Sequence, residues 1–208
     1  EEPFMRTMLN LLLLLLLLPC SITFGQGSLS PEIESAAKTL AFNSGDTAKR
    51  SDAFAVLEKA NKANPNDPYV ASLFATALSL QAKYADEISA RVFWGKKSEV
   101  LIDSVIAKHP SYLFAFATRG VNNSLAPAYL NLSEKAKQDF EFVISRGSQV
   151  QSEQDTEALI MSYFYYSKLI QREVSSNRWS DSDAAKAKAL LTKLKTKFPA
   201  AYDRFTVK

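Results

Sequence analysis

The chain of 208 residues is 47% hydrophobic and 23% charged, and its formal net charge is +3. This balance is ordinary for a globular domain and excludes an intrinsically disordered chain. The 25 basic and 22 acidic residues are interspersed, so no basic segment indicates a nucleic-acid partner. Only 6 glycines and 8 prolines occur, which favours an all-α fold over a β-rich one.

Residues 1–25 have the pattern of a secretory signal peptide. Arg6 precedes an apolar run that contains Leu11–Leu18, and the small residues Thr23 and Gly25 predict cleavage after Gly25. The run is shorter than the roughly 20 apolar residues that a membrane-spanning helix needs. We therefore expect an exported protein with no membrane span after cleavage, and we favour the periplasm as its location.

Cys20, the only cysteine, allows a second interpretation, a lipid anchor. Pro19 stands directly before it, where a lipid-modified cysteine usually follows a small residue, so we favour loss of Cys20 with the signal peptide. An extracellular or lipid-anchored protein stays open as the less favoured alternative. The remaining chain has no cysteine, which excludes disulfides and thiolate metal sites in it.

Hydrophobic periodicity and helix-capping residues predict eight helices and no strand. In chain order, these helices are expected at residues 31–42, 47–63, 68–94, 98–109, 112–123, 133–146, 155–174 and 182–198. Gly95–Lys97 is expected to end the long third helix, with Ser98 capping the fourth. The seventh is apolar nearly all round, so it should lie between neighbouring helices. The helices make four antiparallel hairpins in one domain, residues 31–199, between a short leader at 26–30 and a tail at 200–208.

The second helices of the hairpins share a pattern of small and large apolar residues. Its copies are Ala53/Leu57/Ala60/Pro65, Ala187/Leu191/Leu194/Pro199, the weaker Ser98/Ile102/Val105/Pro110, and Ala136/Phe140/Val143 without the proline. In this pattern the chain resembles the tetratricopeptide repeat (TPR) family, and Phe116 and Gly120 fit the family's first helix. The resemblance covers residues 47–199, although the prolines lie farther apart than the family's roughly 34 residues. It implies a right-handed solenoid whose inner face binds a peptide or partner protein, and it implies no chemistry.

Residues that could carry catalysis are few. His109 is the only histidine, and in a His-Pro pair at a helix end it is better suited to cap the helix than to act as a base. The sequence contains no metal-binding spacing of His or Cys, no nucleophile elbow and no phosphate-binding loop. We therefore predict no catalytic residue, no cofactor and no metal, although an active site built only from carboxylates stays open.

Aromatic and polar side chains that the core pattern does not require are the best candidates for binding a partner. The residues that we predict to bind one are Arg91, Phe93, Trp94, Arg119, Asn122, Asn123, Tyr163 and Tyr166. First helices line the inner face in TPR solenoids, so the resemblance implies that these residues share a groove. The alternative, that the aromatic residues among them fill the core between lengthened helices, stays open.

These observations lead to three hypotheses about function. The first, which we favour, is a non-enzymatic exported scaffold that binds a protein or a peptide. The second is a periplasmic protein that binds a small molecule in a cavity between its lengthened helices, with the architecture of the TPR-like component of TRAP transporters. The third is an enzyme that uses clustered carboxylates.

Overall fold

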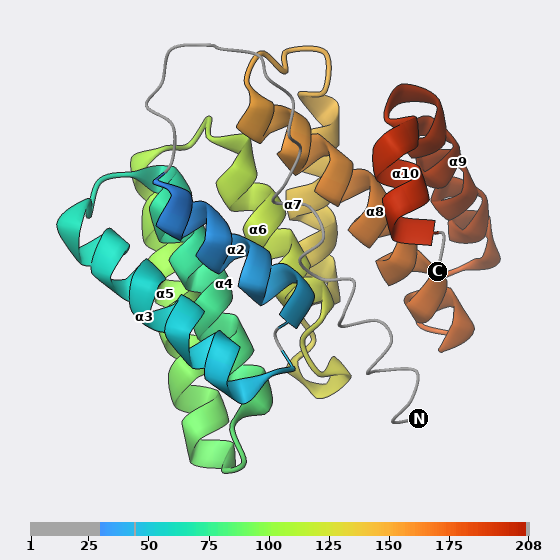
Figure 1. Ribbon diagram of the computed structural model, residues 1–208. Coiled ribbons are helices and arrows are strands. Elements are labelled where there is room, and N and C mark those ends of the chain that lie inside the picture. Colours follow the sequence, from blue (N-terminus) through green and yellow to red (C-terminus); the bar gives the residue numbers. More distant parts are fainter. Residues whose placement is uncertain (1–29, 44, 207–208) are drawn as a thin grey trace. The chain divides into compact units, whose positions relative to one another are not determined.

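The computed structural model describes residues 30–43 and 45–206, and all regular structure in these residues is helical (Figure 1). The helices are α2 Pro31–Asn43, α3 Thr47–Ala63, α4 Pro68–Tyr84, α5 Ile88–Lys108, α6 Leu113–Ser124, η1 Ala128–Leu130, α7 Ser133–Ser145, α8 Glu153–Ser175, α9 Asp181–Lys197 and α10 Pro199–Thr206. The predicted all-α fold is confirmed. The predicted signal peptide, with Cys20, lies outside the described residues.

The helices divide into two compact units, residues 1–101 and residues 102–208, and the division falls within α5. In the first unit α3 packs against both α2 and α4. The side chains of Asp46 and Asp67 cap α3 and α4 by accepting hydrogen bonds from backbone N–H groups at 2.9–3.1 Å. Leu40 and Leu57 are fully buried in the core of this unit, and α4 is buried on most of its sides.

The boundary between α4 and α5 lies earlier in the chain than the sequence predicted. α4 ends at Tyr84, and α5 continues without a break through Gly95, which lies close to Ala82 of α4. Ser98, the predicted cap, is buried and donates its hydroxyl to the carbonyl oxygen of Ala75 at 2.7 Å. The prediction of a break at 95–97 was wrong because packing against α4 outweighs the poor helix propensity of one glycine, which costs about 1 kcal/mol.

α8 is the central helix of the second unit and packs against α6, α7 and α9. Buried residues lie on all its sides, from Glu157 to Glu173. Phe140 of α7 stacks on Tyr166 of α8 with 5.8 Å between the ring centroids. The prediction that the mostly apolar seventh helix lies between its neighbours is confirmed.

The segment that the sequence placed in a tail forms a further helix, α10. α9 ends at Lys197, and Pro199 takes the first position of α10, where its missing N–H removes no helical hydrogen bond. α10 packs on α9, and Phe205 stacks on Phe164 of α8 with 4.2 Å between the ring centroids. The sequence prediction of eight helices missed this one because proline is as suited to begin a helix as to end one.

Most positions of the repeated small-and-large pattern are buried within their units. The members at most 3% exposed are Ala53, Leu57, Ile102, Ala136, Phe140, Val143, Ala187 and Leu194, whereas Ala60 and Leu191 are half-buried. In the second unit α6 also packs against α8, so the first helices of two successive hairpins are in contact, as a repeat arrangement requires. These contacts agree with a repeat-like all-α fold, and the right-handed solenoid stays a prediction.

Gly120 of α6 lies against the ring of Phe140, and a Cβ at this position would be 2.8 Å from Phe140 Cε1. We expect Gly120→Ala to lower the free energy of unfolding by about 1–3 kcal/mol, because the buried ring has little room to move. Urea unfolding followed by far-ultraviolet circular dichroism measures the change. Gly45→Ala is the matched control, since no atom lies within 4 Å of its Cβ position. Equal stability of the two variants would contradict this expectation.

Candidate functional site

An exposed apolar surface on α5 is the candidate site. Ile88 is 77% exposed, Val92 66%, Phe93 51% and Val100 58%. Their helical spacing places these four residues, which we call the α5 stripe, along one side of the helix. On the opposite side, Trp94 and Ser98 contact α3 and α4. α5 thus presents apolar side chains on two faces. Single exposed apolar residues are normal on a protein surface, but the α5 stripe contains four of them on one helix.

Phe93 is held in place by its neighbours. Its ring meets Trp94 edge-on with 5.0 Å between centroids, and Trp94 in turn meets Phe54 of α3 at 5.7 Å. The Lys97 ammonium lies 4.5 Å from the centroid of Phe93 and 5.3 Å from that of Trp94. Such cation–π contacts are worth about 0.5–1 kcal/mol at exposed sites. Because these contacts already restrain Phe93, burying its side chain under a partner would cost less conformational entropy.

Exposed charged side chains accompany the α5 stripe. Asp86 and Glu87 lie in the turn before α5, Arg91 and Lys97 lie on the helix, and Lys96 stands at helical spacing between Val92 and Val100. Arg91 also stabilises the turn before α5, because its Nε donates to the carbonyl oxygen of Ala85 at 2.7 Å. Lys96 donates to Glu99 at 2.9 Å. Apolar side chains with polar and charged neighbours are the usual composition of a protein–protein interface.

Arg119, another predicted binding residue, is engaged inside the second unit. Its guanidinium donates to Asp139 at 2.9 and 2.7 Å and to Asp103 at 2.6 Å. Burial opposes the charge of Arg119, but these hydrogen bonds outweigh it and raise the pKa of the guanidinium. Burial dominates at Asp139 and raises the pKa of that carboxyl despite the ion pair. Asn122 and Asn123 lie one turn after Arg119 on the same side of α6. The Nδ2 atom of each is buried and has no hydrogen-bond partner among the described residues.

The two predicted tyrosines lie in the core of the second unit, Tyr163 being 3% and Tyr166 1% exposed. The Tyr166 hydroxyl donates to Glu141 at 2.6 Å, and Lys186 donates to the same carboxylate at 2.6 Å and to the hydroxyl at 2.9 Å. Burial and the adjacent carboxylate raise the pKa of Tyr166, and burial raises that of Tyr163. This placement supports the core interpretation for both tyrosines. The predicted residues are therefore divided between the units, with Arg91, Phe93 and Trp94 in the first.

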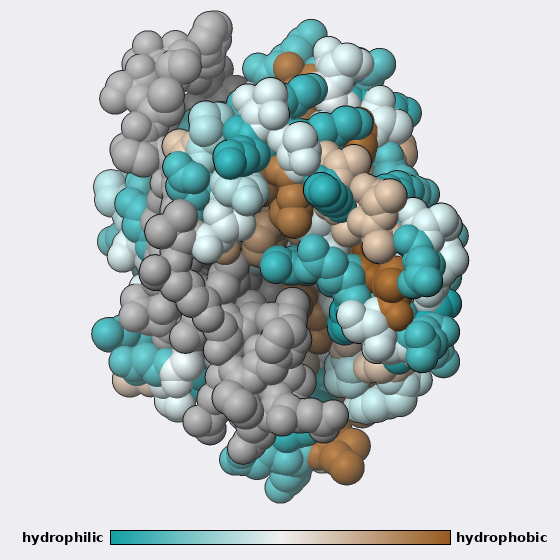
Figure 2. Space-filling view, turned by 90° about the vertical axis from the view of Figure 1, so that its right-hand side faces the viewer, coloured by the Kyte–Doolittle hydropathy of each residue, from teal (hydrophilic) through white to brown (hydrophobic). Residues whose placement is uncertain are grey.

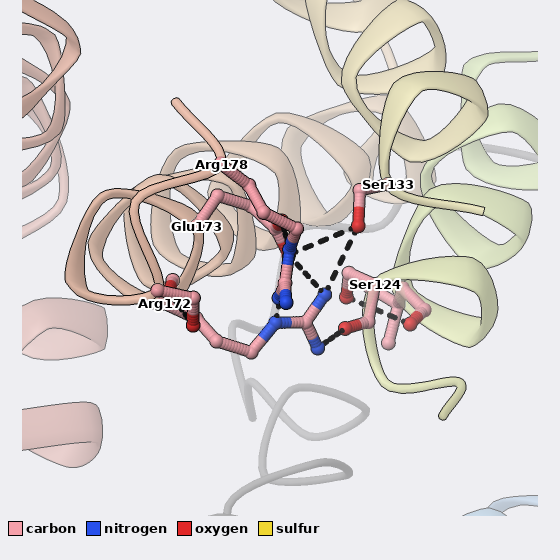
Figure 3. A network of polar contacts seen from close by, with 7 residues as sticks. Ser124, Ser133, Arg172, Glu173 and Arg178 are labelled. Carbon is pink, nitrogen blue, oxygen red and sulfur yellow. Dashed lines mark hydrogen bonds and ion pairs between the residues drawn. The ribbon is translucent and has the colours of Figure 1, made fainter. Parts of the chain in front are cut away.

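A polar cluster that the sequence analysis missed surrounds Glu173 near the end of α8 (Figure 3). This buried carboxylate accepts hydrogen bonds from Arg172 at 2.8 Å, from the Ser133 hydroxyl at 3.0 Å and from Arg178. Arg172 also donates to the carbonyl oxygen of Ser124. Burial alone would raise the pKa of Glu173, but the hydrogen bonds from Arg178, Arg172 and Ser133 lower it to about 2. The feature of the sequence that could have indicated this cluster is Glu173, an acidic residue between Arg172 and Arg178 at the end of a mostly apolar helix.

Among the described residues, the α5 stripe is the larger group of exposed apolar side chains, and Tyr129 and Leu130, 78% and 49% exposed, are the other exposed large apolar residues. Across the described ranges, no group of three or more His, Cys, Asp or Glu residues is placed to hold a metal ion. None of the helices in that part of the chain is long and apolar enough to cross a membrane. The face shown in Figure 2 is mainly hydrophilic, with hydrophobic residues in small separate areas. Comparisons of the chain with protein-family models, with curated proteins and with solved structures found no match.

We expect acid to destabilise the second unit through Glu173. The pKa of its carboxyl is about 2 in the folded protein, against an ordinary value of 4.5, so the folded state binds this proton less tightly than the unfolded chain does. The stabilisation is therefore fully present above pH 4.5 and is lost as the pH falls toward 2. Glu173→Gln should lower the free energy of unfolding at pH 7 by about 3 kcal/mol, because it leaves two arginines without their buried partner. It should also flatten the pH dependence in this range.

Urea unfolding at pH 7 and at pH 3 measures both effects. Glu58→Gln is the control, because Glu58 forms an exposed ion pair with Lys62 at 3.1 Å, and such pairs contribute at most about 1 kcal/mol. If Glu173→Gln kept the stability and the pH dependence of the natural protein, the role of Glu173 would be refuted.

Proposed function

We propose that this protein is a non-enzymatic exported scaffold that binds a protein or peptide partner through the α5 stripe. The exposure of the stripe is the observation that carries the proposal, since Ile88, Val92 and Val100 are each more than half exposed. They lie on a helix whose other side contacts α3 and α4. A helix with apolar side chains on two faces is suited to lie between two layers of structure. Here α3 and α4 form the first layer, and a partner would form the second.

Covering the α5 stripe would contribute appreciable binding free energy. Complete burial of a Val, Ile or Phe side chain is worth about 1.5–3 kcal/mol. Each member of the stripe still has half or more of its surface available for burial. Phe93 is suited to be the central anchor, because restrained aromatic residues are frequent among those that dominate interface energies. The charged residues around the stripe would orient the partner.

Two features of the sequence support the same proposal. The signal-peptide pattern favours export, with the periplasm as the proposed location, and the TPR-like repeat favours a scaffold that holds other proteins. The corrected helix boundary changes one detail. It moves Arg91, Phe93 and Trp94 from the first helix of a hairpin to the second, so the proposed surface differs from the inner face that the resemblance implies.

A photo-crosslinking amino acid at position 92, in place of Val92, tests the proposal in cells that express the chain. We expect irradiation to give a discrete protein adduct, because the stripe is covered by a partner when the scaffold is occupied. The same amino acid in place of Lys59, an exposed residue of α3, should give none. Gel electrophoresis and mass spectrometry identify the adduct. A folded protein that gave no adduct from position 92 would overturn the proposal.

A further inference from the structure

The charges of the chain are interspersed over most of its length, but α9 of the second unit is strongly basic. Residues 184–202 contain five lysines and no acidic residue. The lysines, all exposed and all on α9, are Lys186, Lys188, Lys193, Lys195 and Lys197. The acidic residues of this helix, Asp181 and Asp183, stand in its first turn, and Asp183 forms a capping box with Ser180. The rest of α9 therefore carries only positive charge.

Contacts within the fold account for part of this charge. Lys186 forms an ion pair with Glu141 of α7 at 2.6 Å. The two lysines of the last turn stand where cations interact favourably with the helix dipole. Neither reason applies to Lys188 and Lys193 in the middle of the helix, and no acidic residue in the described part of the chain forms an ion pair with them. Their charges are available to an anionic partner.

The side of α9 that faces away from the core consists of small residues between two rows of lysines. Ala187, Leu190 and Leu194 are buried and define the inner side. With 3.6 residues per turn, the outer strip contains the exposed residues Ala185, Ala189, Thr192 and Thr196. One row beside the strip contains Lys186, Lys193 and Lys197, and the other contains Lys188 and Lys195. Long lysine side chains on both sides can direct their ammonium groups toward one plane, because the stems are flexible.

We propose that α9 binds the surface of a membrane that contains anionic phospholipids. The phosphates of such a surface are complementary in charge to the two lysine rows, and a cluster of four to eight basic residues on a helix is typical of proteins that bind anionic lipids. The small residues of the outer strip allow the helix to approach the headgroups closely. This inference goes beyond the proposed function, because it concerns a different helix and does not require a partner for the α5 stripe.

The composition of α9 favours a lipid surface over the other polyanions. This helix contains neither arginine nor an aromatic residue. Nucleic-acid sites use arginine to read bases and aromatic rings to stack on them, and protein interfaces are usually anchored by the same residue types. Lysine is a strongly hydrated point charge on a flexible stem, which suits a diffuse layer of headgroups. The proposed export also favours a membrane, since an exported chain does not meet cellular nucleic acid.

Co-sedimentation with vesicles tests the proposal on protein purified from cells that export it. We expect at least about 30-fold tighter binding to phosphatidylcholine vesicles with about 30% phosphatidylglycerol than to vesicles of phosphatidylcholine alone. Binding should be lost when the salt rises from about 0.1 M to about 1 M, because the Debye length falls from about 10 Å to about 3 Å. The quadruple variant Lys188→Gln/Lys193→Gln/Lys195→Gln/Lys197→Gln should bind the anionic vesicles at least about 30-fold more weakly.

Two further variants show whether the position of the charge matters. Arginine at the same four positions keeps the charge, so this variant should bind like the natural chain. The matched control replaces four exposed lysines of α3 and α5 by glutamine, at Lys49, Lys59, Lys62 and Lys108. It makes the same change in net charge away from α9, and it should also bind like the natural chain. Far-ultraviolet circular dichroism shows that each variant is folded.

A natural chain that binds anionic vesicles no more tightly than neutral ones would overturn the proposal. Equal losses of binding in the glutamine variant of α9 and in the matched control would overturn it as well, because the attraction would then depend on net charge alone. Binding to a DNA duplex without binding to vesicles would identify a nucleic acid as the partner and refute the membrane. The α5 stripe is unchanged in all these variants, so none of these results bears on the proposed function.

Discussion

The second unit depends on one buried carboxylate. Glu173 lies where the end of α6, the start of α7 and the end of α8 meet, and it accepts hydrogen bonds from Arg172, Arg178 and Ser133. Arg172 also satisfies the carbonyl oxygen of Ser124 at the end of α6, a group that has no partner within its own helix. A buried charge is tolerated only when it is paired and hydrogen-bonded. The arrangement therefore fixes three helix ends relative to one another.

The other polar clusters of the second unit obey the same constraint, and this explains why sequence reasoning assigned some of their members to partner binding. Arg119 has the size and charge of a binding residue, but Asp103 and Asp139 already use its donors. Tyr166 is likewise occupied by Glu141 and Lys186. These partners come from other helices, so the periodicity of a single helix contains no information about them. A side chain that is engaged in the fold and one that is available to a partner differ only in what surrounds them.

Helical periodicity was sufficient to predict the all-α class, the buried repeat positions and the enclosed position of α8. It failed where the local signal and the packing disagree. Gly95 has a poor helix propensity, yet it lies inside α5 beside Ala82, while the true break at residues 85–87 contains neither glycine nor proline. Phe93 and Trp94 were selected as aromatic residues outside the repeat pattern, and only the structure separates the exposed Phe93 from the half-buried Trp94.

The composition of the α5 stripe would also limit which partners it can bind. Lys96 stands at helical spacing between Val92 and Val100, so a cation interrupts the row of apolar side chains. A continuous apolar row would associate with almost any exposed apolar surface, because the hydrophobic effect is not directional. Lys96 donates to Glu99 at 2.9 Å, so a partner that covers this ion pair would have to keep it hydrogen-bonded, since a charge buried without its hydrogen bonds would cancel much of the gain from burying the stripe. The apolar residues would thus supply the affinity of this surface, and the ion pair between Lys96 and Glu99 would disfavour partners that cannot accommodate its charges.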